Sequence, residues 1–294
     1  MDLTYLRAHP EHLQTFLIHQ RIRETPVGGG STGQARRLTL EDGASVFAKS
    51  LADGQPVPDG FFEAETNGLR WLAEAGTVAV PEVLVQLPNL LALEWVESAP
   101  PSTTAAERFG RELADLHRAG ADRYGAPWPG YIGLLPQDNS PGEAWAEWFA
   151  TYRLLPYLRR SADRQALSPD DVAGVERVAA RIDELAPPDE AAPSRLHGDL
   201  WPGNLLWAAD RVWLVDPAAH GGHRETDLAQ LALFGGAPYL DRILASYQER
   251  WPLADGWRAR VPVHQLHLLL VHSAMFGSGY REAVVAATRA VGRA

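Results

Sequence analysis

Polar side chains are concentrated in the stretch LHGDLWPGN, which begins at Leu196 and runs into the hydrophobic segments LLW and VWLV. Asp199 and Asn204 are five positions apart, and Asp216 follows twelve positions later, directly after the second hydrophobic segment. Burying an unpaired carboxylate is costly, so polar groups held between predicted strands indicate a site of chemistry. A polar turn at Pro202 and the residues after it would also explain part of the pattern.

The spacing of these three residues matches what phosphoryl transfer requires. One carboxylate orients the attacking hydroxyl group, while an amide oxygen and a second carboxylate bind magnesium. In kinases the catalytic-loop Asp is followed five positions later by Asn, and the metal-binding Asp comes after the next two strands. This pattern is followed by Asp199, Asn204 and Asp216. The sequence therefore favours a kinase active site over a polar turn without catalytic function.

The N-terminal third contains residues that could bind the phosphates of a nucleotide. The run from Gly28 to Gly33 satisfies the pattern G-x-G-x-x-G and joins two predicted strands, as a kinase glycine loop does. Lys49 lies in the next strand and Glu65 in the following helix, and such a pair can hold phosphate oxygens. Adjacent glycines satisfy the pattern easily, however, so a plain hairpin loop remains the alternative for this segment.

Length, charge and composition limit the classes of protein that fit. The 294 residues suffice for one large or two modest domains, and the formal net charge of -10 argues against binding to a nucleic acid backbone. The chain has no cysteine, which excludes disulfides and thiolate metal sites. With no signal peptide pattern and no apolar run long enough to cross a membrane, we expect a soluble cytoplasmic protein without membrane contact.

The predicted elements change character near residue 97, where the linker-like stretch ESAPPSTT begins. Residues 1–96 contain short helices, an Asp-Gly hairpin, one main helix that Gly76 ends, and two further strands. Residues 97–294 are mostly helical, and Ser168 is the predicted N-cap of one of these helices. We therefore predict an N-terminal nucleotide-binding lobe and a larger C-terminal lobe that carries the catalytic loop.

The histidines do not suggest a zinc site. His197 precedes Asp199 by two positions, and we expect it to pack as a structural residue that braces the loop. His264, His267 and His272 lie along one late helix, with no carboxylate at the spacing of metal ligands. No zinc site is therefore assigned.

Three longer segments, HGDLWPGN, LVDPAAHGGHRETDLAQLALFGG and IGLLPQDNSPGEAWAEWF, resemble the fructosamine kinase family, also called ketosamine 3-kinases. The resemblance extends from about Pro26 to Gly277. It implies an α+β fold of the two-lobed, protein-kinase-like class shared with aminoglycoside phosphotransferases. It further implies ATP-dependent phosphorylation of the sugar 3-hydroxyl of glycated amines, after which the unstable product releases the amine in a repair step.

The resemblance also assigns roles to individual residues. It places the proton acceptor on Asp199 and sugar stacking on Trp201, for which a buried core position is the alternative. Where some relatives carry Cys in the glycine loop, this chain has Ser31, so thiol-based control is absent. Glu65 is preferred to Glu63 as the partner of Lys49. The remaining assignments are Mg²⁺ on Asn204 and Asp216, ATP phosphates on Gly29, Gly30, Ser31, Thr32 and Lys49, adenine on Glu94, Trp95 and Val96, and structural support from His197, Glu225 and Asp227.

Two other functions remain open at this stage. One is a small-molecule kinase of the same fold that acts on aminoglycosides, choline or a similar amino alcohol. The other is a pseudokinase that binds ATP without transfer, but such a protein would be expected to lose Lys49, Asp199 or Asp216, and all three are present. We expect a monomer whose partner is a small-molecule or protein-bound glycated amine. Which ketosamine is preferred is left open.

Overall fold

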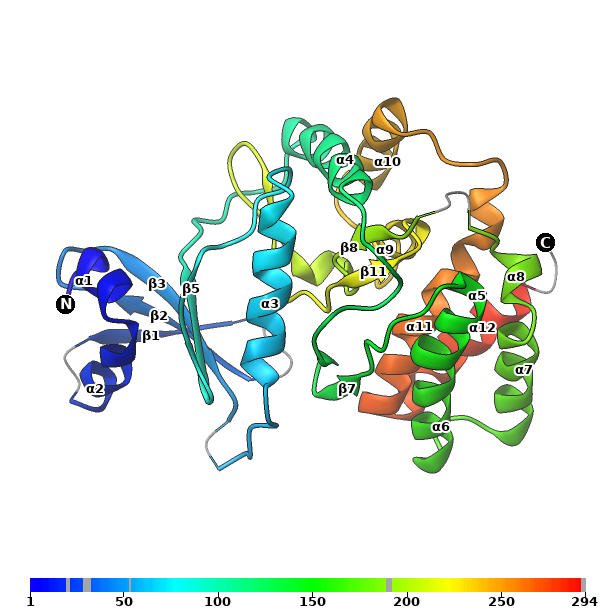
Figure 1. Ribbon diagram of the computed structural model, residues 1–294, viewed down its shortest axis with the longest axis horizontal. Coiled ribbons are helices and arrows are strands. Elements are labelled where there is room, and N and C mark those ends of the chain that lie inside the picture. Colours follow the sequence, from blue (N-terminus) through cyan, green and yellow to red (C-terminus); the bar gives the residue numbers. More distant parts are fainter. Residues whose placement is uncertain (20–21, 29–32, 53, 189–191, 292–294) are drawn as a thin grey trace.

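The computed structural model describes residues 1–19, 22–28, 33–52, 54–188 and 192–291. Figure 1 shows a sheet with its helices in the N-terminal part and a mostly helical remainder, as the sequence predicts. The sheet ends at Glu94, and the next helix begins at Thr103. The lobe boundary near residue 97 stays a prediction. Among the residues described, no helix is both long and apolar enough to span a bilayer.

The N-terminal sheet has five antiparallel strands in the order β1-β2-β3-β5-β4. Lys49 lies on the middle strand, opposite Ala35 on one side and Leu91 on the other. The predicted Asp42–Gly43 turn joins β2 to β3, and Gly43 adopts the positive φ of +82° that such turns favour. The strands are β1 (Arg23–Val27), β2 (Gln34–Thr39), β3 (Ser45–Ser50), β4 (Val83–Leu87) and β5 (Leu90–Glu94).

Helix α3 is the main helix of the N-terminal part and runs alongside the sheet (Figure 1). Phe62, Leu69 and Leu72 recur at helical spacing and are all buried. Gly76, just beyond the helix, has a positive φ of +65°. The helices of this part are α1 (Leu3–Ala8), the 3₁₀ helix η1 (Pro10–His12), α2 (Leu13–Ile18) and α3 (Phe61–Glu74).

The C-terminal part consists of helices around three short two-stranded sheets. Ser168 forms the predicted N-cap, and its side chain and that of Asp171 make a reciprocal capping box. The short strands are β6 (Gly130–Ile132), β7 (Leu135–Gln137), β8 (Ser194–Leu196), β9 (Leu205–Trp207), β10 (Val212–Leu214) and β11 (His220–Gly222), and the 3₁₀ helices are η3 (Pro202–Asn204) and η4 (Ser278–Tyr280). The helices are α4 (Thr103–Arg118), α5 (Trp145–Phe149), the π-helix η2 (Ala150–Leu154), α6 (Leu155–Asp163), α7 (Pro169–Ala179), α8 (Ile182–Leu185), α9 (Glu225–Gln230), α10 (Leu240–Arg250), α11 (Trp257–Phe276) and α12 (Arg281–Val291).

The π-helical turn η2 separates α5 from α6. Pro156 explains the interruption, because proline has no N–H and its ring clashes with the carbonyl four residues earlier. The widened turn contains Arg153, whose side chain is fully buried. An insertion of this kind re-aims a side chain, and it is frequent at functional sites.

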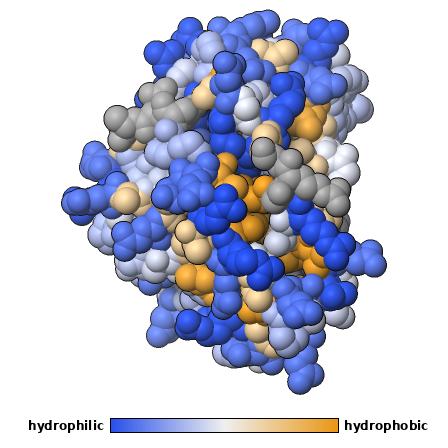
Figure 2. Space-filling model, turned by 90° about the vertical axis from the view of Figure 1, so that its right-hand side faces the viewer, coloured by the Kyte–Doolittle hydropathy of each residue, from blue (hydrophilic) through white to orange (hydrophobic). Residues whose placement is uncertain are grey.

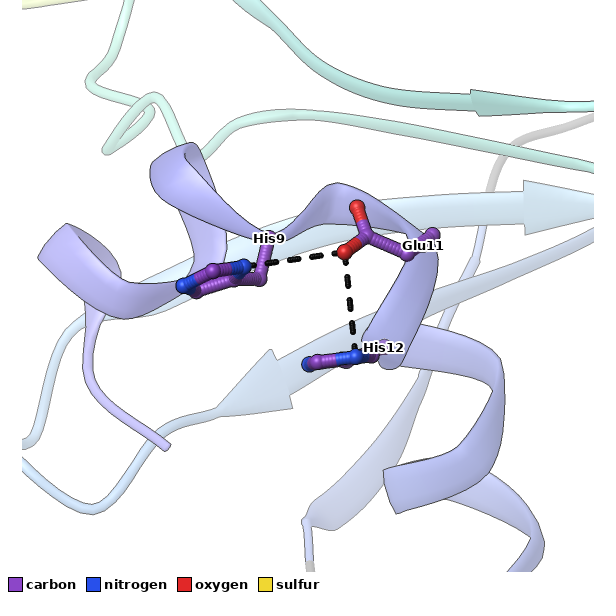
Figure 3. A group of neighbouring side chains, drawn as sticks. All are labelled: His9, Glu11 and His12. Atoms are coloured by element: carbon purple, nitrogen blue, oxygen red, sulfur yellow. Dashed lines mark ion pairs between the residues drawn. The ribbon is translucent and has the colours of Figure 1, made fainter.

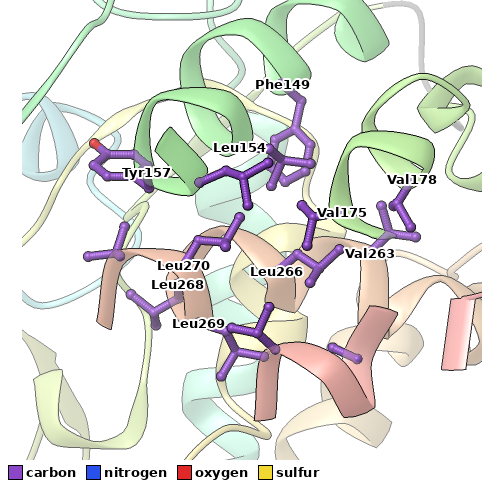
Figure 4. Close-up of a cluster of buried hydrophobic side chains, with 14 of the residues drawn as sticks. Phe149, Leu154, Tyr157, Val175, Val178, Val263, Leu266, Leu268, Leu269 and Leu270 are labelled. Atoms are coloured by element: carbon purple, nitrogen blue, oxygen red, sulfur yellow. The ribbon is translucent and has the colours of Figure 1, made fainter. Parts of the chain in front are cut away.

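The largest hydrophobic core of the C-terminal part lies between α6, α7 and α11 (Figure 4). Helix α11 presents apolar side chains on several sides, including Leu266, Leu268, Leu269 and Leu270, as a buried helix does. Figure 2 shows the face on the side of α7 and α8, where hydrophilic residues cover most of the surface and hydrophobic ones emerge only in small separate areas. The apolar residues of the catalytic-loop region, Leu200 and Leu205, pack in a second core together with Leu228 and Leu231.

Candidate active site

The loop that follows β8 is fixed from behind by α9. Asp227 accepts hydrogen bonds from the backbone N–H groups of His197 (2.8 Å) and Gly198 (2.9 Å). Gln230, one turn later, accepts from the N–H of Leu200 at 2.7 Å. A side chain at position 198 would meet the carbonyl oxygen of Ala218 at 2.2 Å, and the backbone there has a φ of +82°, so only glycine fits.

His197 is fully buried within this loop. Its Nε2 donates to the carbonyl of Val215 at 2.9 Å, which leaves Nδ1 to accept from the N–H of Asp199 at 3.3 Å. Burial lowers the pKa of this imidazole, so the ring is neutral at pH 7. His197 thus joins the loop to the residue before Asp216 and fixes the distance between the two acidic positions.

On the opposite face of the loop, Asp199 is held by Asn204. The amide nitrogen of Asn204 donates to the backbone carbonyl of Asp199 (2.8 Å) and to its carboxylate (3.1 Å). The other carboxylate oxygen of Asp199 is buried and has no hydrogen-bond partner within the described part of the chain. Burial raises the pKa of Asp199 to about 7. An unsatisfied carboxylate with a pKa near neutrality is suited to exchange a proton.

Lys49 joins the N-terminal sheet to the C-terminal part through two carboxylates. Its Nζ lies 2.5 Å from Glu65 on α3 and 2.7 Å from Asp216, which lies 167 positions away in the sequence. Burial opposes the charge on each of these groups, but the two carboxylates raise the pKa of Lys49, and Lys49 lowers the pKa of Asp216. Burial raises the pKa of Glu65 to about 7. Glu63 is exposed, so Glu65 is the partner of Lys49.

The backbone of Asp216 has a φ of +54°, in the left-handed region that residues other than glycine seldom adopt. Its side chain is 51% exposed, although one oxygen is bonded to Lys49. Strained backbone of this kind is concentrated at ligand-binding sites, where the surrounding structure maintains it. Here the strain directs a carboxylate toward Lys49 in the space between the two parts.

Two cavities meet at Lys49 and Asp216. The Asp199 cavity (about 100 Å³) also contains Glu65, Asn204 and Trp201 in its wall. The Trp95 cavity (about 370 Å³) lies beside it and is lined by Gly28, Gly33, Glu94, Trp95 and Val96 among others. Both cavities share Phe61 and Gly203 as well.

The predicted site residues are thus distributed over two adjoining spaces. Gly29, Gly30, Ser31 and Thr32 lie outside the described residues, but the glycines on either side line the Trp95 cavity. A side chain at position 33 would meet the carbonyl oxygen of Ser50 at 2.5 Å, so glycine is required where β2 is about to begin. The residues brought together around Lys49 are Glu65, Asp199, Asn204 and Asp216.

The donor set around Asp216 fits a hard divalent cation. The amide nitrogen of Asn204 is used in bonds to Asp199, which leaves its amide oxygen available, and Asp216 supplies a carboxylate. Oxygen ligands of this kind suit Mg²⁺, which is usually held by one or two carboxylates together with the phosphates of a substrate. Asn204 and Asp216 are therefore the residues that could hold Mg²⁺.

The chain is similar to known proteins over nearly its whole length. The family model described as fructosamine kinase matches residues 7–291. A probable ketoamine kinase from Enterococcus faecium is 34% identical over 273 residues, which cover 91% of this chain and 95% of that protein. The ketosamine-3-kinase of Mus musculus is 30% identical over 86% of this chain and 90% of its own length. The chain belongs to the fructosamine kinase family.

Solved structures support the same assignment. The crystal structure of a putative fructosamine-3-kinase from Thermobifida fusca YX-ER1 is 51% identical, has a TM-score of 0.88, and covers 93% of this chain and 94% of that chain. The choline kinase LicA from Streptococcus pneumoniae has a TM-score of 0.63 at 16% identity and covers 96% and 100%, which indicates a shared fold only. The predicted fold class and family resemblance are confirmed, and this family member is a kinase.

Sequence reasoning missed several residues of this kinase. Trp128, Tyr131 and Asn139 line the Asp199 cavity, and the amide oxygen of Asn139 accepts from the buried guanidinium of Arg153 at 2.7 Å. The segment PQDN contributed to the family resemblance, but nothing in its spacing indicates a cavity wall. His117 of α4 is a further support, since its Nε2 lies 3.2 Å from the carboxylate of Asp227.

Glu225 has a structural contact with another helix. Arg260 of α11 donates to its carboxylate at 2.8 Å, and His264 lies 3.5 Å away, so Glu225 braces α11 rather than the catalytic loop. Burial opposes its ionisation, but the bond from Arg260 lowers the pKa of Glu225 to about 2. The carboxylate of Glu225 lies beside His264 although the two residues belong to different helices, α9 and α11. Residue spacing along a single helix could not predict this contact.

The described residues contain two groups of His and Glu whose ligand atoms lie within 4.8 Å of one another. His223, Glu225 and His264 form the buried group, in which Arg260 already occupies the carboxylate. Figure 3 shows the other group, where Glu11 lies between His9 and His12 at 3.6 and 3.7 Å. It belongs to the N-terminal helices and lines neither cavity.

Proposed function

We propose that this enzyme transfers the γ-phosphoryl group of ATP to a hydroxyl group of a ketosamine. The observation that carries the proposal is the meeting of Lys49, Asp216 and Asp199 where the two cavities join. Membership in the fructosamine kinase family supports a ketosamine as the acceptor. Relatives named ketoamine kinase and ketosamine-3-kinase support the same substrate class.

In this proposal ATP occupies the Trp95 cavity. The backbone of Glu94 to Val96 binds the adenine edge, and Lys49 binds the phosphates. The family resemblance assigns phosphate binding to Gly29, Gly30, Ser31 and Thr32 as well. Glu65 orients Lys49 through its ion pair. Mg²⁺ held by Asn204 and Asp216 would neutralise charge on the phosphates during transfer. Lys49 then exchanges its bond with Asp216 for phosphate oxygens.

Asp199 is the proposed proton acceptor. Its free carboxylate oxygen accepts the proton of the attacking sugar hydroxyl, while Asn204 holds the other oxygen in place. Because the pKa of Asp199 is about 7, deprotonation of this carboxylate and thus turnover should increase as the pH rises through neutrality. The loop contacts from Asp227 keep the acceptor at a fixed position.

The acceptor is the 3-hydroxyl group of the sugar, as the family resemblance implies. The sugar lies in the Asp199 cavity, where Trp201 stacks on one of its faces and Asn139 provides a polar wall. The phosphorylated product is unstable and releases the amine, so the reaction serves the repair of glycated amines. Both small and protein-bound glycated amines fall within this class.

The decisive experiment measures ADP release with a panel of acceptors. Fructose- and ribulose-derived ketosamines should be turned over, whereas kanamycin-type aminoglycosides and choline should not. Turnover of an aminoglycoside or choline, combined with none for any ketosamine, would replace the proposal by the alternative kinase. Phosphorus NMR of the product identifies the hydroxyl that receives the phosphate.

Nucleotide binding is tested separately by thermal unfolding. Mg-ATP at a hundredfold its Kd should stabilise the folded protein by about 2.7 kcal/mol. Asp216→Asn should reduce this effect, while Asp210→Asn, at a carboxylate that pairs with Arg108, should leave it intact. Absence of any shift in the unmodified protein would contradict the proposed nucleotide site.

A further inference from the structure

Five aromatic rings contact one another in a series that begins with Trp201 in the wall of the Asp199 cavity. We call Trp201, Phe234, His272, Phe276 and Tyr280 the aromatic wall. Trp201 meets Phe234 edge to face, with 5.8 Å between ring centroids. Phe234 contacts His272 at 4.6 Å, and His272 contacts Tyr280 at 5.0 Å and Phe276 at 5.6 Å.

Trp201 connects this wall to the site of phosphoryl transfer. The indole of Trp201 lines the Asp199 cavity. In the sequence, Trp201 follows Asp199 by two positions. The ring packs over Gly203, where an added side chain would overlap it at 2.1 Å. A substrate that stacks on Trp201 therefore has the aromatic wall directly beside it.

Phe234 is placed in the wall by an unfavourable backbone. Its φ is +52°, and Gly235 (+98°) and Gly236 (+80°) continue the same left-handed turn. A bulky residue rarely adopts this conformation, for which glycine or asparagine is better suited. The ring is still 41% exposed, so much of its apolar surface is not used in packing. Because this exposed ring also contacts Trp201, it leaves apolar surface available to a ligand beside the Asp199 cavity.

The wall is apolar and uncharged. Phe234 and Phe276, which is 48% exposed, are two of the five large hydrophobic side chains found exposed among the described residues. Nδ1 of His272 donates to the carbonyl of Leu268 at 2.8 Å, and burial lowers the pKa of this ring, so it is neutral at pH 7. The adjacent cation Arg281 is paired with Asp171. Such a surface favours aliphatic or aromatic groups.

We propose that the aromatic wall binds the apolar stem attached to the nitrogen of the ketosamine, either an alkyl chain such as that of a lysine side chain or an aryl group. The inference rests on the proposed function, which places the sugar against Trp201. A ketosamine has two ends, and the sugar end enters the cavity that contains Asp199. The stem on its nitrogen then leaves past Trp201 and covers Phe234 and Phe276.

The test compares two ketosamines that carry the same sugar, one made from methylamine and one from hexylamine. The enzyme should favour the hexylamine adduct about tenfold or more in kcat/KM, because several methylenes are removed from water. Phe234→Gly suits the backbone at this position, so the variant should fold, and a thermal melt checks this. In Phe234→Gly the ratio of the two kcat/KM values should fall close to one.

Tyr239 provides a matched control. It is also an exposed aromatic residue (45%) with a positive φ of +57°, but its ring contacts Trp207 and not the wall. Tyr239→Gly should therefore retain the preference for the hexylamine adduct. A parent enzyme that treats both adducts alike, a Phe234→Gly variant that keeps the preference, or an equal loss in Tyr239→Gly would each overturn the inference while the proposed function stands. If neither adduct is phosphorylated, both the inference about the aromatic wall and the proposed function are overturned.

Discussion

The two faces of the catalytic loop use buried carboxylates in opposite ways. On the cavity face, Asp199 has one oxygen without a partner and a pKa raised to about 7. On the rear face, Asp227 is bonded by two backbone N–H groups and lies beside His117. Glu225, two positions before Asp227 in α9, is bonded by Arg260, and although burial opposes its ionisation, its pKa is lowered to about 2.

Burial alone does not explain this difference, because all three carboxylates are largely removed from solvent. The hydrogen-bond donors around each carboxylate decide whether it is structural or able to accept a proton. Donors directed at a carboxylate stabilise its charged form and make it structural, whereas a missing donor leaves it ready to accept a proton. A rigid, satisfied rear face thus supports a reactive, unsatisfied front face.

The largest effect is expected for Asp199→Asn. The substitution preserves shape but removes the proton acceptor, so turnover should fall by roughly 10²- to 10⁴-fold. Nucleotide affinity should change little, because the lost interaction belongs to the transferring state. Steady-state rates beside nucleotide titrations measure both quantities. A decrease of less than about threefold, well below that range, would show that Asp199 is not the acceptor.

Asp227→Ala should show the structural side of the comparison. It leaves the N–H groups of His197 and Gly198 buried without an acceptor, which should destabilise the fold by about 2–4 kcal/mol. Turnover should also fall, because the loop is no longer held. Urea unfolding measures the first effect. If stability is unchanged and only turnover falls, Asp227 belongs with the reactive carboxylates instead.

Glu225→Gln should destabilise the protein without altering the catalytic loop. The folded-state pKa of about 2 lies below the ordinary value of 4.5, so this carboxylate stabilises the fold above pH 4.5 and loses that contribution as the pH falls toward 2. The variant should be less stable at neutral pH by on the order of 2–3 kcal/mol. This difference should shrink in acid. Denaturant unfolding at pH 7 and pH 3 provides the comparison, with Glu249→Gln, on an exposed residue of α10, as control.

The stability change in Asp199→Asn should have the opposite sign to that in Glu225→Gln. The folded-state pKa of about 7 lies above the ordinary value of 3.8, so ionisation of Asp199 costs folding free energy that appears as the pH rises from 3.8 to 7. Above pH 7 the variant, without ligands, should be more stable than the parent by up to about 4 kcal/mol. Equal stability of the two proteins at pH 8 would contradict the raised pKa.

Local patterns were sufficient for much of the fold. The Asp42–Gly43 turn, the Ser168 cap and the apolar face of α3 each depend on a few neighbouring residues, and all three are present in the structure. The π-helical turn η2 between α5 and α6 has no comparable local signal. A proline in the second position of a new helix looks the same as one inside an existing helix.

The sequence by itself determined the chemical types in the site, since Asp199, Asn204 and Asp216 are close enough along the chain for their spacing to identify a kinase pattern. Contacts between distant segments were decided only by tertiary structure. These are the bond from Lys49 to Asp216 across 167 positions, the support of Asp227 by His117, and the aromatic wall built from four separate segments. The physical reason is that a pKa, a strained φ or an unsatisfied oxygen depends on which groups surround a residue in space, and chain order does not specify those neighbours.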